Sequence, residues 1–205
     1  MDGVLADSEP VYYAAMQSVL APLGIEIRDE HQRAVMGSSI ESTWQYFAET
    51  FALEGPLDAL VEAYDLQLRR LLAEVNETLP GVRELIPKLR ERGLPIGVAS
   101  SSIPEWIEAL LGGLGLQDAF DVAVSAREAG ASKPAPDVYL LAAARLGVEA
   151  SGCIAVEDTP TGLASAKAAG MFVVQTRSAS SAFPPLAGAD VVIESLLEFP
   201  MELLG

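Results

Sequence analysis

Short apolar runs alternate with helix-like segments from Pro80 onward, and this alternation constrains the fold more than any other feature. The helices expected here are Val82–Arg92, Pro104–Gly112, Asp137–Leu146, Pro160–Ala169 and one near the C-terminus. The apolar runs are Leu94–Ala99, Asp121–Ser125, Cys153–Val156, Met171–Gln175 and Val191–Ile193. Because strands that alternate with helices form a parallel sheet with right-handed crossovers, the sequence predicts an α/β fold.

Residues 10–79 show a helical pattern that no strand-like run interrupts. Pro10 suits a first helical turn, and Ala14, Leu20 and Leu23 recur at helical spacing. Further helices are expected at Glu30–Met36, Glu41–Phe51 and Leu57–Val75. We therefore expect an all-helical domain at residues 10–79, inserted into an α/β core domain made of residues 1–9 and 80–205.

The charge balance excludes two classes of partner. The 205-residue chain has 13 Lys and Arg residues against 29 Asp and Glu residues, a formal net charge of −16. Nucleic acids and anionic membranes require basic side chains that neutralise phosphates, so neither is an expected partner. A small phosphorylated molecule is not excluded, because one lysine and one divalent cation can hold a phosphate locally.

Cysteine usage and the start of the chain indicate a reducing compartment. Cys153 is the one cysteine, so no internal disulfide can form. The start, MDGVLADSEP, lacks a basic region followed by an apolar run, and no stretch of about 18 apolar residues occurs. We expect a cytoplasmic protein that is a monomer or a small homo-oligomer.

Four polar motifs occur along the chain, and three of them stand beside the ends of predicted strands or loops, where a parallel sheet binds its ligands. In chain order they are Asp2-Gly3-Val4-Leu5-Ala6-Asp7-Ser8-Glu9, Ser100-Ser101-Ser102, Ser132-Lys133-Pro134-Ala135-Pro136-Asp137 and Glu157-Asp158-Thr159-Pro160. Each motif alone can be explained as a turn, a helix cap or a solvated charge. Their occurrence together, in this order, indicates a functional site.

The residue types in these motifs suit phosphoryl transfer. Hydroxyl and backbone N–H groups hold phosphate oxygens, and a lysine acts on the same group as a compact positive charge. Adjacent carboxylates hold Mg²⁺, a hard cation that takes oxygen ligands and keeps several waters. Positioning and charge neutralisation are most of what this reaction requires.

The four motifs together resemble those of the haloacid dehalogenase (HAD) superfamily, in its phosphatase and β-phosphoglucomutase-like branch. That family begins with Asp-x-Asp-Gly, often continued as Asp-Ser-Glu, and residues 2–9 match the second half of this pattern. Ser100 matches the hydroxyl residue of the second motif, Lys133 the third motif, and Glu157-Asp158 the acidic fourth motif. The resemblance covers nearly the whole chain and implies a Rossmann-like parallel sheet with a helical cap at residues 10–79.

The resemblance also implies a role for each matching residue. Asp2 would act as the general acid and base, Ser100, the Ser101 backbone and Lys133 would hold the phosphate, and Ser100 and Lys133 would be catalytic together with Asp2. Mg²⁺ would be bound by Asp158 directly, by Glu157 directly or through water, and by the Asp2 carbonyl. The implied activity is a Mg²⁺-dependent phosphatase that acts on a small phosphorylated metabolite, such as a sugar phosphate, through a phospho-aspartate intermediate.

The chain departs from the family pattern at its first residue. In the family, the nucleophilic aspartate lies two residues before the residue that Asp2 matches. In this chain that position falls just ahead of Met1. The apolar strand that precedes this aspartate in the family is absent as well, and its loss would leave two strand edges unpaired. Asp7 follows the loop and does not fit as a substitute. We expect a natural chain that starts upstream of Met1.

Two other functions stay open at this stage. A β-phosphoglucomutase-like mutase would use the same core, but the family's mutases carry an arginine after the glycine of the second cap helix. The stretch Gly37-Ser38-Ser39-Ile40-Glu41 has none, and Arg33 is the nearest. The second is a non-catalytic binding protein with this fold. That hypothesis predicts that the other motif residues have been replaced, yet all of them match the family pattern.

Overall fold

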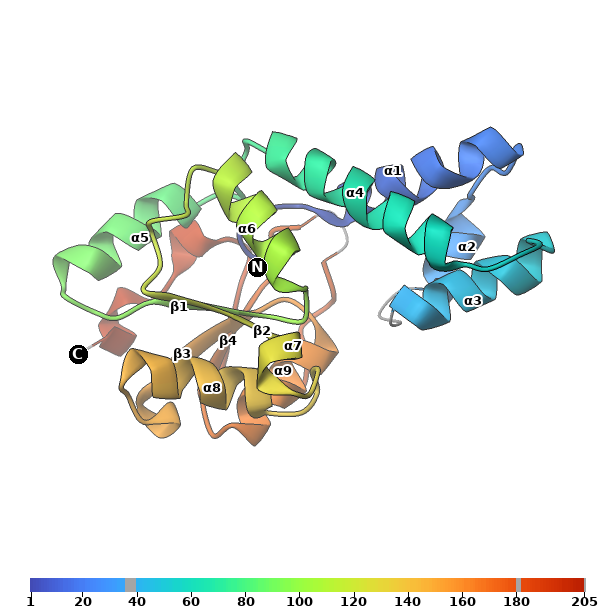
Figure 1. Cartoon of the computed structure of the whole chain (residues 1–205). Helices are drawn as coiled ribbons and strands as arrows, with labels where there is room; N and C mark the ends of the chain where they lie inside the picture. The colour runs from blue at the N-terminus through green and yellow to red at the C-terminus, as the bar shows by residue number, and fades with distance from the viewer. Residues whose placement is uncertain (36–39, 180–181, 205) are drawn as a thin grey trace. The chain divides into compact units, whose positions relative to one another are not determined.

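The computed structural model describes residues 1–35, 40–179 and 182–204 (Figure 1). The chain divides into two compact units, one made of Met1–Glu9 with Ala73–Gly205 and the other of Pro10–Leu72. The domain limits expected from the sequence, at residues 9 and 79, stay a prediction. None of the helices in the described part of the chain is long and apolar enough to cross a membrane.

The unit formed by residues 10–72 is helical, as its sequence pattern predicts. Its elements are α1 (Glu9–Leu20), the 3₁₀ turn Ala21–Leu23, α2 (Asp29–Val35), α3 (Ile40–Phe51) and α4 (Asp58–Glu74). Trp44 and Phe47 of α3 are buried and in contact, and the Trp44 ring also packs edge to face on Tyr64 of α4, with 5.7 Å between the ring centroids. Met36, the expected end of one helix, lies outside the described residues.

The other unit contains the predicted alternation of strands and helices. Its strands are β1 (Gly97–Ser100), β2 (Val122–Ser125), β3 (Ile154–Glu157), β4 (Phe172–Thr176) and β5 (Val191–Ile193). Its helices are α5 (Val82–Glu91), α6 (Pro104–Gly113), α7 (Ala126–Ala129), α8 (Asp137–Leu146) and α9 (Pro160–Ala168). Figure 1 shows α5 and α6 on one side of the strands and α7, α8 and α9 on the other, as in a Rossmann-like fold.

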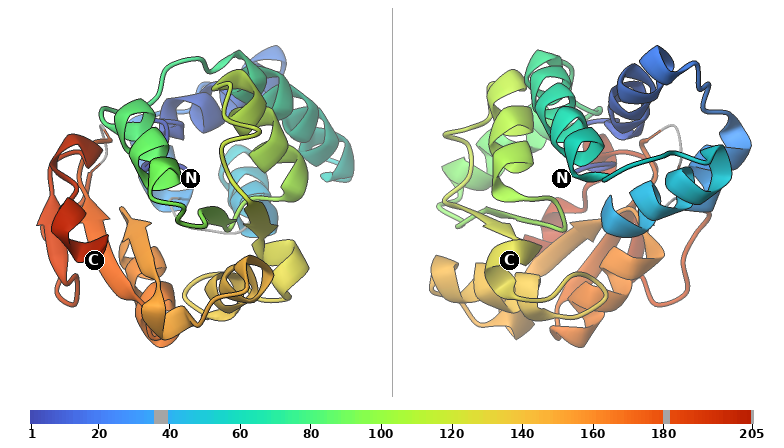
Figure 2. Two further views of the ribbon diagram at one scale, coloured as in Figure 1. Left: turned by 90° about the vertical axis from the view of Figure 1, so that its left-hand side faces the viewer. Right: turned by 45° about the vertical axis from the view of Figure 1, so that its right-hand side comes forward.

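All strand pairs within the described residues are parallel, which confirms the α/β architecture, but they form two sheets. β1 pairs with β2, in the register that places Ser100 opposite Ser125. β4 lies between β3 and β5, and Glu157 stands opposite Gln175. The views in Figure 2 show the same two groups of strands from other sides. The edges of β1 and β3 that face away from their partners therefore lack a neighbouring strand in the described part of the chain.

Helix α8 links the two groups of strands through the core. Val138 and Ala142 of α8 are buried in the same cluster as Val124 of β2 and Ala155 of β3. The small alanine side chains allow the helix to approach both sheets closely. This packing brings the carboxyl ends of β1 and β3, where the candidate site residues lie, to the same part of the unit.

The end of the chain differs from the expectation. Instead of a last α-helix, it forms two 3₁₀ turns, Leu196–Glu198 and Met201–Leu204. Pro200 stands between them, and proline disfavours helical backbone at the residue that precedes it. The predicted C-terminal helix was therefore wrong.

Candidate functional site

The loop at the start of the chain lies beside the end of β1. Leu5 N–H donates to the Met1 carbonyl over 2.7 Å, and Gly3 N–H donates to the Ala6 carbonyl over 2.9 Å. Gly3 has a φ of +66°, in the left-handed region that favours glycine. The loop is thereby folded tightly, and it presents the side chain of Asp2 to the end of β1.

Two hydroxyl groups hold the carboxylate of Asp2. The fully buried Ser8 donates to Oδ1 over 2.5 Å, and Ser102, which follows β1, donates to Oδ2 over 3.3 Å. Both carboxylate oxygens therefore accept a hydrogen bond, and the orientation of the side chain is fixed from two segments that are far apart in the sequence. The structure thus brings Asp2 to the Ser100-Ser101-Ser102 motif.

The serines that end β1 have different surroundings. Ser100 is buried, and its Oγ accepts a hydrogen bond from the Ser102 backbone N–H over 3.1 Å. Ser101 is exposed in the turn that follows the strand. The turn presents hydroxyl groups and backbone N–H groups at the strand end, which is the arrangement that phosphate oxygens require.

Asp158 lies directly against the loop that carries Asp2. An ideal β-carbon at Gly3 would stand 1.9 Å from Asp158 Oδ2, far inside van der Waals contact. The absence of a side chain at Gly3 is therefore what allows the carboxylate of Asp158 to approach the loop backbone. Two of the four motifs meet at this point.

Lys133, Glu157 and Tyr139 form a buried polar cluster. The Lys133 ammonium group donates to the Ala99 carbonyl over 3.1 Å, to the Tyr139 hydroxyl over 3.3 Å and to Glu157 Oε1. The Tyr139 hydroxyl donates to the same Glu157 oxygen. The Lys133 and Glu157 side chains are only 11% and 6% exposed, so the pair is shielded from water. Through Ala99 of β1 and Glu157 of β3, the cluster joins the two sheets at their carboxyl ends.

The other carboxylate oxygen of Glu157, Oε2, lies against the first turn of helix α9. Thr159 caps α9 by accepting the Gly162 N–H over 3.1 Å, so Gly162 lies in the first turn next to the end of β3. A β-carbon at Gly162 would stand 1.9 Å from Glu157 Oε2. Glu157 is therefore confined between Gly162 on one side and Lys133 with Tyr139 on the other.

Glu157 and Asp158 are adjacent in the chain, but their pKa values are shifted in opposite directions. Burial, followed by the nearby charge of Glu157, raises the pKa of Asp158 from 3.8 to about 6; Asp2 also raises it and the chain's amino group lowers it. Burial acts to raise the pKa of Glu157 too, but Lys133 and the Tyr139 hydroxyl together hold it below its ordinary value. Burial, and then Glu157, raise the pKa of Tyr139 well above its ordinary value. Negative charge is thus less compensated at Asp158 than at Glu157.

Oxygen donors of this site suit a hard divalent cation. Within the described residues, no group of three or more His, Cys, Asp or Glu side chains could hold a metal ion. Glu157 is turned toward Lys133, whereas Asp158, beside Asp2, forms no ion pair with a lysine, arginine or histidine side chain of the described residues. Mg²⁺ keeps several waters and needs only one or two carboxylates, so these residues fit it.

Three site residues were missed by the sequence analysis. Ser8 and Gly3 belong to a recognised motif, but nothing in the spacing indicates that Ser8 bonds to Asp2 or that Gly3 contacts Asp158. Tyr139 stands in the first turn of α8, six residues after Lys133, where an aromatic residue is expected to pack in the core. No sequence signal distinguishes it from a core residue.

The fold and this site define an α/β enzyme with a polar site at the carboxyl ends of parallel strands. The family profile described as haloacid dehalogenase-like hydrolase matches residues 1–176, and the chain belongs to this family. The expected family is thereby confirmed.

Relatives within the family carry different names. Hexitol phosphatase B of Escherichia coli (strain K12) is 37% identical over 210 residues, which cover 100% of this chain and 94% of that protein. Beta-phosphoglucomutase of Bacillus subtilis (strain 168) is 28% identical over 211 residues, which cover 100% of this chain and 91% of that protein. The crystal structure of CbbY from Rhodobacter sphaeroides in complex with phosphate has a TM-score of 0.81 at 26% identity, covering 98% of this chain and 93% of that one.

Proposed function

We propose that this hydrolase is a Mg²⁺-dependent phosphatase that acts on a small phosphorylated metabolite, specifically the phosphate ester of a sugar or sugar alcohol. The observation that carries the proposal is the meeting of Asp2, the serines after β1, Lys133 and Glu157-Asp158 at one place. The 37% identity to a hexitol phosphatase favours this substrate class.

Phosphate binding is assigned to the groups around the end of β1. The Ser100 hydroxyl and the Ser101 backbone N–H offer neutral donors, and Lys133 offers positive charge. Lys133 is held over the Tyr139 ring and against the Ala99 carbonyl, so its ammonium group is positioned before a ligand arrives. Positioned charge is what stabilises the transferring phosphoryl group.

Asp158 and Asp2 are assigned to the cation, Asp158 through its carboxylate and Asp2 through its carbonyl, with Glu157 as an additional ligand directly or through water. Bound Mg²⁺ would neutralise the phosphate oxygens. A cation beside Asp158 would also offset the burial and the nearby charge of Glu157 that raise the pKa of this residue.

Asp2 is assigned the proton transfers. When a nucleophilic carboxylate attacks phosphorus and the bond to the leaving alcohol oxygen breaks, Asp2 donates its proton to that oxygen. Water then attacks the phosphorus of the phospho-aspartate and gives a proton to Asp2. This step releases phosphate and restores the nucleophilic carboxylate and the protonated Asp2. Ser8 and Ser102 hold the Asp2 carboxylate in one orientation through both steps.

On the family pattern, the nucleophilic aspartate would stand two residues before Asp2, directly ahead of Met1. The decisive experiment compares three polypeptides: residues 1–205, the same with an apolar strand that ends in aspartate fused to Met1, and the same with asparagine in place of that aspartate. Phosphate release is measured with hexitol phosphates, hexose phosphates and p-nitrophenyl phosphate, with Mg²⁺ or with EDTA.

We expect turnover only from the polypeptide with the added aspartate, and only with Mg²⁺. Robust turnover by residues 1–205 alone would show that the assignment of the aspartates is wrong. Conversion of a hexose 1-phosphate to the 6-phosphate, dependent on a bisphosphate primer and without phosphate release, would favour the mutase. Gly37, Ser38 and Ser39, on which the sequence argument against a mutase rests, lie outside the described residues.

The place of action is proposed as the cytoplasm, on the expectation that a chain with Cys153 as its one cysteine works in a reducing compartment. Its partner would be the small phosphorylated metabolite, and the formal charge of −16 argues against nucleic acid and anionic membranes.

A further inference from the structure

The buried polar cluster at the carboxyl ends of β1 and β3 contains a side chain that has no role in the proposed reaction, Tyr139. This residue is 7% exposed and stands in the first turn of α8. Its hydroxyl donates to Glu157 Oε1 and accepts a hydrogen bond from the Lys133 ammonium group over 3.3 Å. The hydroxyl thus contacts both a residue assigned to the phosphate and a residue assigned to the cation.

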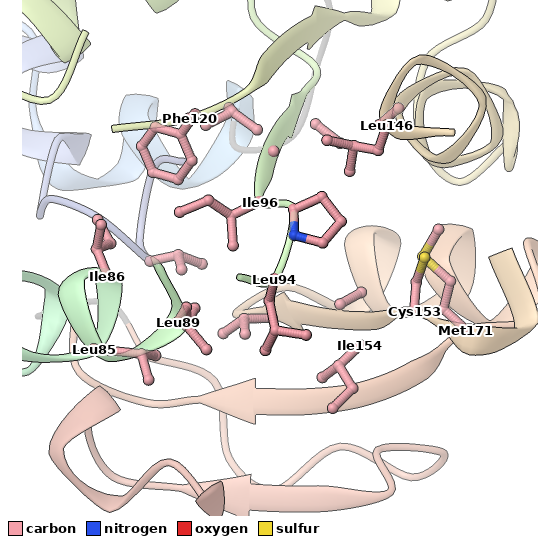
Figure 3. Close-up of a pocket in the computed structure, with 18 of the residues that line it drawn as sticks. Leu85, Ile86, Leu89, Leu94, Ile96, Phe120, Leu146, Cys153, Ile154 and Met171 are labelled. Carbon is pink, nitrogen blue, oxygen red and sulfur yellow. The ribbon is translucent and has the colours of Figure 1, made fainter. Parts of the chain in front are cut away.

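The ring of Tyr139 faces apolar groups. It lines an apolar slot of about 460 Å³ in the α/β unit, which Leu146 and Ile154 also line (Figure 3). None of the described residues that line the slot has a charged side chain. A hydroxyl that turned toward the slot would lose its hydrogen bonds without replacement, which is costly for a buried polar group. The hydroxyl is therefore kept at the cluster.

The hydrogen bonds of Lys133 use the full capacity of its ammonium group. This group carries three N–H donors and no acceptor. Within the described residues it has three acceptors, which are the Ala99 carbonyl at 3.1 Å, the Tyr139 hydroxyl at 3.3 Å and Glu157 Oε1. A phosphate oxygen that accepts a hydrogen bond from Lys133 must therefore replace one of these three acceptors.

The Tyr139 hydroxyl is the acceptor whose replacement costs least. Glu157 is a buried carboxylate, and separating such a group from its cation is strongly destabilising. The Ala99 carbonyl is fixed in β1, which pairs with β2. The Tyr139 hydroxyl is neutral, its contact with Lys133 is the longest of the three, and it keeps its own hydrogen bond to Glu157 when Lys133 turns away.

We propose that Tyr139 is a positioning residue for phosphate binding, whose hydroxyl accepts the third N–H of Lys133 until a phosphate oxygen replaces it. Throughout this exchange the O–H group of Tyr139 continues to donate to Glu157. The inference rests on the proposed function, in which Lys133 holds the phosphate. The exchange is favourable because a hydrogen bond from an ammonium group to a charged oxygen is stronger than one to a neutral hydroxyl.

The exchange predicts that Tyr139→Phe has opposite effects on stability and on phosphate affinity. Phenylalanine keeps the ring, but the hydrogen bond to Glu157 is lost both with and without phosphate. The bond from Lys133 is lost only from the phosphate-free protein, where it competes with the ligand. Inorganic phosphate should therefore bind about two- to tenfold more tightly, although the variant unfolds at a lower urea concentration. A purely structural role would weaken phosphate binding together with stability.

The experiment titrates inorganic phosphate into residues 1–205 in the presence of Mg²⁺ and obtains Kd by calorimetry. The parent is compared with Tyr139→Phe, Tyr13→Phe and Lys133→Met. Tyr13→Phe is the matched control, because its hydroxyl donates to the Ile27 carbonyl in the helical unit, and it should leave Kd unchanged. Lys133→Met should raise Kd roughly tenfold or more, since it removes a charged hydrogen-bond donor.

The outcomes separate the inference from the proposed function. Tighter binding by Tyr139→Phe alone supports the exchange. Unchanged or weaker binding by Tyr139→Phe, with weaker binding by Lys133→Met, would overturn the exchange and leave the assignment of Lys133 intact. An unchanged Kd in Lys133→Met would show that Lys133 does not hold the phosphate, which would overturn that assignment and the exchange with it.

Nuclear magnetic resonance of isotope-labelled tyrosine ζ-carbons gives a second readout in the parent protein. The Tyr139 signal is identified by its disappearance in Tyr139→Phe. Saturating phosphate should move this signal, because the attached oxygen loses the Lys133 donor, and should leave the Tyr13 signal in place. A Tyr139 signal that stays unchanged at saturating phosphate would overturn the proposal, whatever the affinities of the variants.

Discussion

The carboxylate of Asp158 occupies the space where a side chain at Gly3 would begin, because a β-carbon there would stand 1.9 Å from Oδ2. Substitution Gly3→Ala is therefore expected to push Asp158 away from the loop and to weaken Mg²⁺ binding at least tenfold. Calorimetric titration with Mg²⁺ measures the effect.

Gly24→Ala is the matched control for Gly3→Ala. Gly24 has a φ of +75°, close to the +66° of Gly3, and no atom lies within 4 Å of its ideal β-carbon. Left-handed backbone costs both alanines roughly 1–2 kcal/mol, so only the contact with Asp158 distinguishes them. Equal Mg²⁺ affinity in the two variants would contradict the metal assignment.

Gly162 makes the equivalent contact with Glu157, where a β-carbon would stand 1.9 Å from Oε2. Alanine is normally better than glycine in a helix by about 1 kcal/mol. At this position we expect the opposite, a loss of at least about 2 kcal/mol of the free energy of unfolding, because overpacking displaces a buried ion pair. Urea unfolding followed by circular dichroism provides the measurement.

The control for Gly162→Ala is Gly112→Ala in α6, where the ideal β-carbon meets no atom within 4 Å. That substitution should be neutral or stabilise the protein by up to about 1 kcal/mol. If both substitutions proved stabilising, Glu157 would not be confined by α9 as the structure indicates.

Tyr139→Phe removes a hydrogen-bond donor from the charged oxygen of buried Glu157. Such bonds contribute about 1.5–3 kcal/mol, so the free energy of unfolding should fall by that amount. The substitution should also raise the pKa of Glu157, since the Tyr139 hydroxyl helps to hold it low.

Tyr13→Phe is the comparison for Tyr139→Phe, because the Tyr13 hydroxyl donates to a neutral acceptor, the Ile27 carbonyl. Hydrogen bonds between neutral groups contribute about 0.5–1.5 kcal/mol. A smaller loss for Tyr139→Phe than for Tyr13→Phe would mean that the hydroxyl does not support the ionised form of Glu157.

The limits of several elements were predictable from local chemistry. Helix α8 was expected at Asp137–Leu146 and is found there, since Pro136 precedes it and Gly147, with a φ of +71°, ends it. Helix α7, Ala126–Ala129, was missed because four residues show no periodicity. Its capping box between Ser125 and Glu128 was the available signal.

The candidate site was predictable as a set of residues but not as a set of contacts. The motif order placed Lys133 and Glu157 in one site, whereas their direct pairing depends on the packing of α8 against both groups of strands. The donation from Ser8 to Asp2 depends on the conformation of a tight loop. Contacts of this kind arise from tertiary structure, and the spacing of residues along the chain does not encode them.

Asp158 makes the stability of the metal-free protein depend on pH. Its pKa is about 6 in the folded chain and 3.8 ordinarily, so between these values the folded protein retains a proton that the unfolded chain releases. The stability contributed by this group is therefore present below pH 3.8 and is lost as pH rises to about 6. The difference between the two pKa values corresponds to a loss of about 3 kcal/mol, fully developed at pH 7.

Asp158→Asn should abolish this dependence, because an amide keeps the shape of the carboxylate without its charge. In EDTA at pH 7 we expect the variant to be more stable than the parent by up to about 3 kcal/mol, with no difference below pH 4. In Mg²⁺ the order should reverse, since the parent gains the binding free energy of the cation and the variant does not.

Urea unfolding from pH 4 to pH 7, with EDTA or with Mg²⁺, tests both statements. Asp118→Asn, at an exposed position, serves as the control for loss of one surface charge. If Asp158→Asn retained the slope between pH 4 and pH 6, Asp158 would not carry the raised pKa. If it retained full Mg²⁺ affinity, Asp158 would not be the principal ligand, and the mechanism that assigns it the cation would be wrong.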